Sequence, residues 1–388
     1  MENVSSSNGL EKRPKLRFPG FDEPWKMVSL QDISEYRKNK ICVSKSKYIS
    51  TENMLQNFAG IIPYTSEEDI SGVEFCVGDT LLANIRPYLR KAWLATHDGA
   101  CSTDVLALCP LDITPAFLNN IIEQDRFIDY VMSGVKGSKM PRGDKAHILA
   151  YETAIPSLLE QEKINSFMQL LHQRIAKIQM EIELLKKYKR GVNNQILSQI
   201  DNSYNCRLGS VCEIVGGGTP DTLHTEYWGN TVEWFTPSEI GKTKYVNNSV
   251  RKLSDIGLDN SSAKLLPIGT VLLTTRATLG EMSIAKRECS TNQGFQSLIP
   301  HTDRVSSEYL YYMQIIIKPW CEKYASGNTF REISKSALSD CIIPIPDRAR
   351  QEQIVKLLSS IDMLIGAAES ISMSLSKIRH GLMQQLFI

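Results

Sequence analysis

The sequence lacks a long apolar run, and this excludes an ordinary membrane-spanning helix. No stretch of about 18 apolar residues occurs in the 388-residue chain. The first residues, MENVSSSNGLEKRPK, are polar and charged, so we expect a loose tail over residues 1–15 and no secretory signal. Nine cysteines, an odd number, include no Cys-x-x-Cys pair. This pattern favours reduced thiols in a cytoplasmic protein and argues against a structural zinc site.

A basic excess is also missing. The chain has 44 Lys and Arg against 43 Asp and Glu, a net charge of +1, whereas a nucleic-acid-binding protein usually has a strong positive excess. Binding through local basic patches is still compatible with this balance. An apolar content of 42% and a charged content of 22% are typical of a soluble globular protein. At this length we expect two or more domains, because one core does not usually serve so long a chain.

Several catalytic motifs are absent. The chain has no Pro-Pro, which excludes the Asp/Asn-Pro-Pro-aromatic loop of adenine methyltransferases, and no Asp-x-Lys or Glu-x-Lys, which excludes the common restriction nuclease site. It also has no His-Glu-x-x-His and no Gly-x-Ser-x-Gly. TPSEIGKT approaches a P-loop, but Thr236 stands where the first glycine is required. The six histidines show no metal-binding spacing, so we expect a non-catalytic chain.

The chain contains a long internal repeat with an offset of 190 residues. IPSLLEQEKI (155–164) and IPDRARQEQI (345–354) both begin Ile-Pro, carry Gln-Glu at the same place and end in Ile. Each opens a segment whose apolar residues follow steps of four and three, which is a heptad seam. The first seam is Ile164, Met168, Leu171, Ile175, Ile178, Ile182 and Leu185, and the second is Ile354, Leu358, Ile361, Ile365, Ala368, Ser372 and Leu375. The pattern predicts two long helices, over residues 151–200 and 344–388.

The regions before the two helices correspond more loosely. VGDTLLANIRPYLRKAWLA (77–95) resembles IGTVLLTTRATLGEMSIA (268–285). We therefore predict an α+β fold with two globular domains, residues 16–150 and 201–343, joined by two long helices. A helix with an exposed apolar stripe needs a partner, and the obvious partner is the other copy. Two matched copies favour antiparallel coiled-coil packing about a pseudo-twofold axis over an ordinary core helix.

Loops in both domains carry residue types suited to DNA. In the first domain the candidates are Arg86, Tyr88, Arg90, Lys91, Lys136, Ser138, Lys139, Arg142 and Lys145. In the second domain they are Thr274, Thr275, Arg276, Thr278, Asn328, Thr329 and Arg331. Arg can pair with guanine, Asn with adenine, and Thr or Ser with phosphate or base edges. The alternative is that these loops are solvated turns. Trp234 and Phe235 are interpreted as core residues and not as stacking platforms.

Several motifs together resemble the specificity subunit of a type I restriction-modification system, over nearly the whole chain. They are LRFPGFDEPWK near the start, GGGTP, YWGN, VEWFTPSEI and GNTFREISKSAL in the second domain, and the two IP…QE-I helix starts with their NNQIL and MQQLF ends. Within these motifs Gly217, Thr219 and Thr236 become further DNA-binding candidates. The resemblance implies two target-recognition domains, each reading one half of a split DNA site, with two helices spacing the halves.

The resemblance also implies partners and cofactors. Two methyltransferase subunits would dock on the long helices, which makes Gln161, Glu162, Gln351 and Glu352 candidates for partner binding. Motor-nuclease subunits would join the assembly. The methyl donor, ATP and magnesium are expected on those partner subunits and not on this chain. Two other hypotheses stay open: a coiled-coil scaffold that displays two protein-binding modules, and an enzyme of unfamiliar type within one domain.

Overall fold

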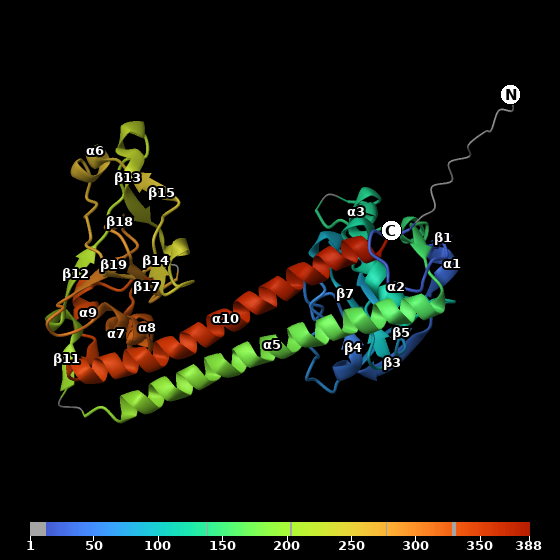
Figure 1. Cartoon of the computed structure of the whole chain (residues 1–388), viewed down its shortest axis with the longest axis horizontal. Helices are drawn as coiled ribbons and strands as arrows, with labels where there is room; N and C mark the ends of the chain where they lie inside the picture. The colour runs from blue at the N-terminus through green and yellow to red at the C-terminus, as the bar shows by residue number, and fades with distance from the viewer. Residues whose placement is uncertain (1–12, 138, 202–203, 277, 328–330) are drawn as a thin grey trace. The chain divides into compact units, whose positions relative to one another are not determined.

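The computed structural model describes residues 13–137, 139–201, 204–276, 278–327 and 331–388 (Figure 1). It divides into two compact units. The first is Met1–Gln179 together with Ser370–Ile388, and the second is Met180–Glu369. Both long helices cross this division, so each unit contains a segment of each helix. Ser138, Asn328 and Thr329, three of the predicted DNA-binding residues, lie outside the described residues.

The first unit contains two four-stranded sheets and a two-stranded ribbon. In spatial order, one sheet is β2 (Ser34–Tyr36), β9 (Val105–Pro110), β6 (Thr80–Ala83) and β7 (Ala92–Leu94). The other is β3 (Lys40–Ser44), β5 (Asp69–Phe75), β8 (Gly99–Cys101) and β4 (Tyr48–Ile49). The ribbon pairs β1 (Lys26–Ser29) with β10 (Glu152–Ile155). β4 and β8 run parallel, and the other strand pairs of these sheets are antiparallel.

Short helices cover these sheets. They are α1 (Leu30–Ile33), η1 (Lys45–Lys47), η2 (Pro87–Leu89), α2 (Pro115–Ile122), α3 (Asp125–Ser133) and α4 (Lys145–Leu149). Phe117 of α2 and Phe127 of α3 are fully buried, and they belong to one apolar cluster with Leu108 of β9. Met383 and Phe387, near the end of the C-terminal helix, belong to the same cluster. The core of the first unit therefore includes the last turns of the chain.

The second unit repeats this plan. Its larger sheet is β12 (Cys212–Gly216), β19 (Gln296–Pro300), β16 (Val271–Leu273), β17 (Met282–Ala285) and β14 (Tyr245–Val246). Its smaller sheet is β15 (Arg251–Leu253), β13 (Trp228–Phe235) and β18 (Cys289–Thr291), and its ribbon is β11 (Asn205–Arg207) and β20 (Ile342–Pro344). The order β12-β19-β16-β17 matches β2-β9-β6-β7 of the first unit. The loose sequence correspondence therefore reflects a shared topology.

The helices of the second unit are η4 (Leu208–Ser210), η5 (Thr225–Tyr227), η6 (Pro237–Glu239), α6 (Asp255–Asp259), α7 (Ser307–Tyr312), α8 (Gln314–Tyr324) and α9 (Lys335–Ser339). In this unit α7, α8 and α9 occupy the places of α2, α3 and α4, whereas the shorter helices before them differ in number and place. Trp234 is 3% exposed and Phe235 is 1% exposed. Their interpretation as core residues is confirmed.

The two long helices are α5 (Leu158–Ser198) and α10 (Arg348–Leu386). The seam residues predicted from the heptad pattern are buried or half-buried along both helices. Within the second unit the helices run antiparallel, because Lys186 lies 2.9 Å from Glu369 while Lys189, further along α5, lies 2.5 Å from Asp362, nearer the start of α10. Within the described residues, no helix is long and apolar enough to cross a membrane.

Candidate nucleic-acid interface

In the second unit a short polar segment, residues 291–294, brings several predicted loops together. The backbone N–H of Gly218 donates to the carbonyl of Thr291 at 2.8 Å, and that of Thr275 donates to the carbonyl of Gly294 at 2.8 Å. The Thr219 hydroxyl donates to the side chain of Gln293. Residues 216–219 and 274–276 are therefore fixed against one common segment.

Position 217, the second glycine of GGGTP, must be glycine for a steric reason. A Cβ atom at Gly217 would lie 2.0 Å from the carbonyl oxygen of Asn292 and 2.4 Å from the hydroxyl of Thr291. Any side chain at this position would push the two loops apart. Nearby, the indole N–H of Trp234 donates to the carbonyl of Gly218 at 3.0 Å in a buried hydrogen bond. Gly217 therefore allows a close approach between backbones that positions Thr219.

The structure contradicts the prediction that the side chains of Thr274 and Thr275 contact DNA. Both residues are 0% exposed: they directly follow the buried strand β16 and hydrogen-bond to neighbouring backbone, Thr274 N–H to the carbonyl of Glu281 and Thr275 N–H to that of Gly294. The hydroxyl of Thr275 donates to Glu332 at 3.4 Å and so faces the protein. Arg276, the next residue, is 43% exposed and pairs with the same Glu332 at 2.9 Å. Arg276 is therefore the side chain that this loop presents to solvent.

The other candidates of the second unit differ in how exposed their side chains are and in the hydrogen bonds that these side chains already make. The Thr236 hydroxyl donates to Glu239 at 2.7 Å and caps η6, so this group already has an internal partner. Arg331 donates to the carbonyl of Glu322. Among the described candidates of this unit, Thr278 and Arg331 are exposed, and the side chain of Arg276 is 43% exposed.

In the first unit the loop at 84–91 meets residues 139–142. Arg86 donates its backbone N–H to the carbonyl of Pro141 at 2.8 Å, and Arg142 pairs with Asp104 at 3.0 Å. Arg86 adopts a left-handed backbone with a φ of 51°, which is uncommon for a residue other than glycine. The side chains of Arg86, Tyr88, Lys139, Arg142 and Lys145 are exposed. The two loops of this unit therefore present exposed basic side chains and one exposed tyrosine.

Three cations of these loops are held by the protein itself. Arg90 pairs with Asp125 at 2.6 Å, and Lys91 donates to the carbonyl of Thr51 at 2.6 Å. Lys136 pairs with Asp144 at 2.5 Å. The hydrogen bond from Lys136, together with the N–H of His147, lowers the pKa of Asp144 to about 2. Arg90 and Lys91 hold the loop through these contacts, whereas the Lys136 side chain is 79% exposed.

Sequence reasoning missed Asn292 and Gln293, which join the loops of the second unit. Their equivalents in the first unit are Ser102 and Thr103, followed by Asp104, the partner of Arg142. Each segment follows a short buried strand, β8 or β18. A residue-by-residue comparison at the 190-residue offset is the signal that would have found them.

For two of the four predicted partner-binding residues, the structure contradicts the prediction. Gln161 and Gln351 are each 1% exposed. Gln161 accepts a hydrogen bond from the Thr114 N–H at 2.9 Å, and Gln351 accepts one from the Ser306 N–H at 3.1 Å. The repeated glutamine thus ties the first turn of each long helix to the start of α2 or α7. The neighbouring Glu162 and Glu352 are exposed and stay candidates.

Comparison with known proteins agrees with this architecture. A family model described as "Type I restriction modification DNA specificity domain" matches residues 201–373. The type I restriction enzyme MjaIX specificity subunit of Methanocaldococcus jannaschii is 35% identical over 186 residues, which are 47% of this chain and 43% of that protein. The chain thus spans less than half of that relative. The putative MjaX specificity subunit of the same organism is 22% identical over 97% of this chain and 96% of its own length.

A solved structure extends the likeness to the fold. The type I restriction-modification S subunit from M. genitalium has 14% sequence identity and a TM-score of 0.59, over 97% of this chain and 99% of that one. At this identity the match shows the fold alone. The second half of the chain therefore contains a type I restriction modification DNA specificity domain, and over its whole length the chain is similar to specificity subunits of type I restriction-modification systems.

Proposed function

We propose that each unit reads one half of a bipartite, asymmetric DNA site. The observation that carries the proposal is that the two units share a strand order while their exposed loop residues differ. The first unit presents Arg86, Tyr88 and Arg142, and the second presents Arg276 and Thr278. Two domains that share a strand order but present different side chains to DNA would each recognise a different base sequence. As a specificity subunit, the chain is non-catalytic.

The long helices set the distance between the half-sites in this proposal. Their seams are buried along both helices, which supports a stiff connection. The net charge of +1 supports a division of labour with partner subunits. Those subunits supply many of the phosphate contacts, and phosphate contacts dominate the affinity of DNA binding.

The partner subunits dock on the outer faces of the helices. Large apolar side chains exposed there support this part of the proposal; they include Leu170, Met180 and Leu184 on α5, and Met363, Leu364 and Met373 on α10. Glu162 and Glu352 flank these faces. Two methyltransferase subunits occupy the helices, motor-nuclease subunits join them in the cytoplasm, and the methyl donor, ATP and magnesium bind to those partners.

Mapping of methylated positions in genomes with and without this gene tests the proposal. We expect one split sequence motif to lose its methylation when the gene is deleted. Salt-dependent binding of the assembled complex to duplex DNA separates this function from a protein-binding scaffold, because a scaffold would show no such dependence. Unchanged methylation on deletion would refute DNA recognition by this chain.

A further inference from the structure

Each unit contains one short helix whose ends make polar contacts with the two long helices. In the first unit it is α2, and in the second it is α7. The residues that cap their C-terminal ends, Glu123 and Met313, are 190 positions apart. The helix that follows each domain holds the N-terminal end through Gln161 or Gln351. The question is therefore what holds the opposite end.

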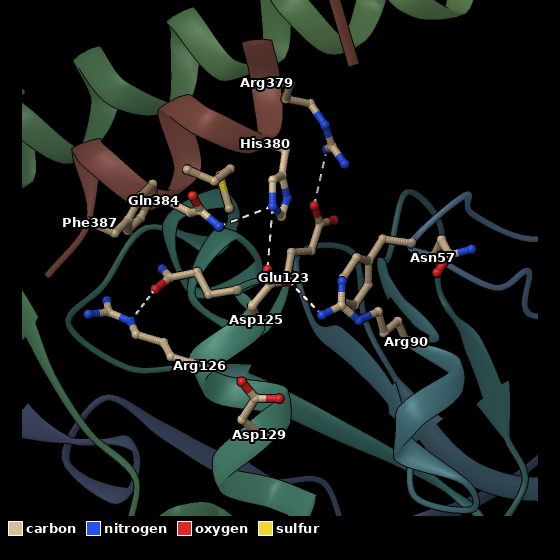
Figure 2. A pocket seen from close by; sticks show the side chains of 13 residues that line it. Asn57, Arg90, Glu123, Asp125, Arg126, Asp129, Arg379, His380, Gln384 and Phe387 are labelled. Atoms are coloured by element: carbon tan, nitrogen blue, oxygen red, sulfur yellow. Dashed lines mark hydrogen bonds and ion pairs between the residues drawn. The ribbon is translucent and has the colours of Figure 1, made fainter. Parts of the chain in front are cut away.

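In the first unit the other long helix, α10, holds that end. Figure 2 shows Arg379 and His380 of α10 facing the corner between α2 and α3. Arg379 lies 3.2 Å from Glu123, and the two side chains are 26% and 12% exposed. His380 lies 3.4 Å from Asp125. The opposite oxygen of Glu123 accepts a hydrogen bond from Asn119 at 2.9 Å, so the carboxylate is fixed on both sides.

This corner also reaches the predicted reading loop. Asp125 pairs with Arg90 at 2.6 Å through its other carboxylate oxygen (Figure 2). Arg90 closes η2 in a left-handed conformation with a φ of 54°, and η2 carries Tyr88. A chain of polar contacts thus runs from His380 of α10 through Asp125 and Arg90 to the loop that presents Arg86 and Tyr88.

In the second unit the cation comes from α5. Lys189 lies 2.5 Å from Asp362, and the other oxygen of Asp362 accepts a hydrogen bond from the Tyr312 hydroxyl at 2.8 Å. Tyr312 is the last residue of α7, and the Lys189 ammonium lies 5.3 Å from its ring centroid. Burial raises the pKa of Tyr312, so the hydroxyl keeps the proton that it donates. Lys189 and Arg379 are 190 residues apart and therefore occupy equivalent positions of the repeat.

We propose that Arg379 and Lys189 are positioning residues, each of which fixes the recognition domain of its unit to the long helix that does not follow that domain. The two glutamines hold one end of α2 and α7. At the other end Arg379 pairs with Glu123, while Lys189 lies over the ring of Tyr312 and pairs with Asp362 of α10, the acceptor of the Tyr312 hydroxyl. Held at both ends, each domain keeps one orientation on the helix pair, and this orientation determines which spacing of the DNA half-sites is accepted. The last step depends on the proposed function.

The test uses the chain assembled with its methyltransferase subunits. The variants are Arg379→Gln and Lys189→Gln. The matched controls are Lys377→Gln and Lys187→Gln, two exposed cations at equivalent positions of the same helices. Arg379→Lys and Lys189→Arg retain the charge and should restore the parent behaviour. Two readouts are measured: amide hydrogen exchange of each unit, and methylation of a duplex library with fixed half-sites and varied spacers.

We expect Arg379→Gln to raise exchange about tenfold in residues 115–125 and to leave residues 307–313 unchanged, because a part-buried charge-assisted contact is lost in one unit. Lys189→Gln should have the reverse effect. Both variants should methylate spacers that the parent rejects. Equal loosening of both units, the same exchange in the control variants, or unchanged spacer tolerance would overturn the inference. If the parent complex shows no preference among duplexes, the proposed function fails, while the exchange measurement still decides the positioning role.

Discussion

Replacement of Gln351 by alanine should destabilise the second unit strongly. The side chain is 1% exposed, and it makes three hydrogen bonds to backbone groups. Its amide nitrogen donates to the carbonyls of Arg304 at 2.8 Å and Pro346 at 2.9 Å, and its oxygen accepts from the Ser306 N–H at 3.1 Å. The substitution leaves all three backbone groups without this partner.

The magnitude follows from the number of lost bonds. Each one contributes about 1 kcal/mol, so the free energy of unfolding should fall by about 3 kcal/mol. For a unit of this size that corresponds to a decrease in Tm of about 6–12 °C. Urea unfolding gives the first quantity and calorimetry gives the second. Hydrogen exchange should place the loss in the second unit and leave the first unchanged.

The adjacent residue supplies the control. Glu352 is 68% exposed at its side chain and makes an ion pair with Arg348 at 3.3 Å. Because exposed pairs of this kind contribute little, Glu352→Ala should change the stability by less than about 0.5 kcal/mol. If Gln351→Ala and Glu352→Ala were equally stable, the reasoning about the repeated glutamine would be refuted.

Three other predictions concern the seam, the spacing and the thiols. Ile175→Asp places an unpaired charge in the buried seam and should cost several kcal/mol of unfolding free energy; a urea transition like that of the parent would show that the seam is misassigned. Four residues inserted after Tyr188 lengthen α5 by about 6 Å, so methylation mapping should show a spacer longer by about one or two base pairs with the same half-sites; an active complex with the old spacer would contradict this. Burial raises the pKa of Cys212 and Cys289 to about 12, which suppresses their thiolates at pH 8, so iodoacetamide should label exposed Cys42 first; equal rates in mass spectrometry would argue against this burial.

The long helices could be predicted from the sequence because their signal is local. An apolar residue recurs every three or four positions from Ile164 to Leu185, and this pattern can be recognised without knowing any contact between distant residues. Because of the repeat, the same helix and seam were predicted for α10. Its one polar seam residue, Ser372, is indeed buried. The looser correspondence of the regions before the helices predicted two similar domains, and the structure adds their common strand order.

The reading residues could be predicted less well because their environment is decided by distant segments. Thr275 and Arg276 are adjacent polar residues, yet one is enclosed beneath the loop and the other is exposed. Gln161 looked like a surface residue of a helix, but its partner Thr114 lies 47 positions away in the chain. A polar side chain that is satisfied internally has the same sequence signature as one that binds a partner, and only tertiary structure separates the two.

The central claim, that each unit reads its own half-site, is tested most directly by a chimaera. Residues 201–343 would be replaced by the equivalent domain of another type I specificity subunit, and the methylated positions of the host genome would then be mapped. The account predicts that one half-site changes, while the other half-site and the spacer between them are retained. A change in both half-sites, or in neither, would contradict it.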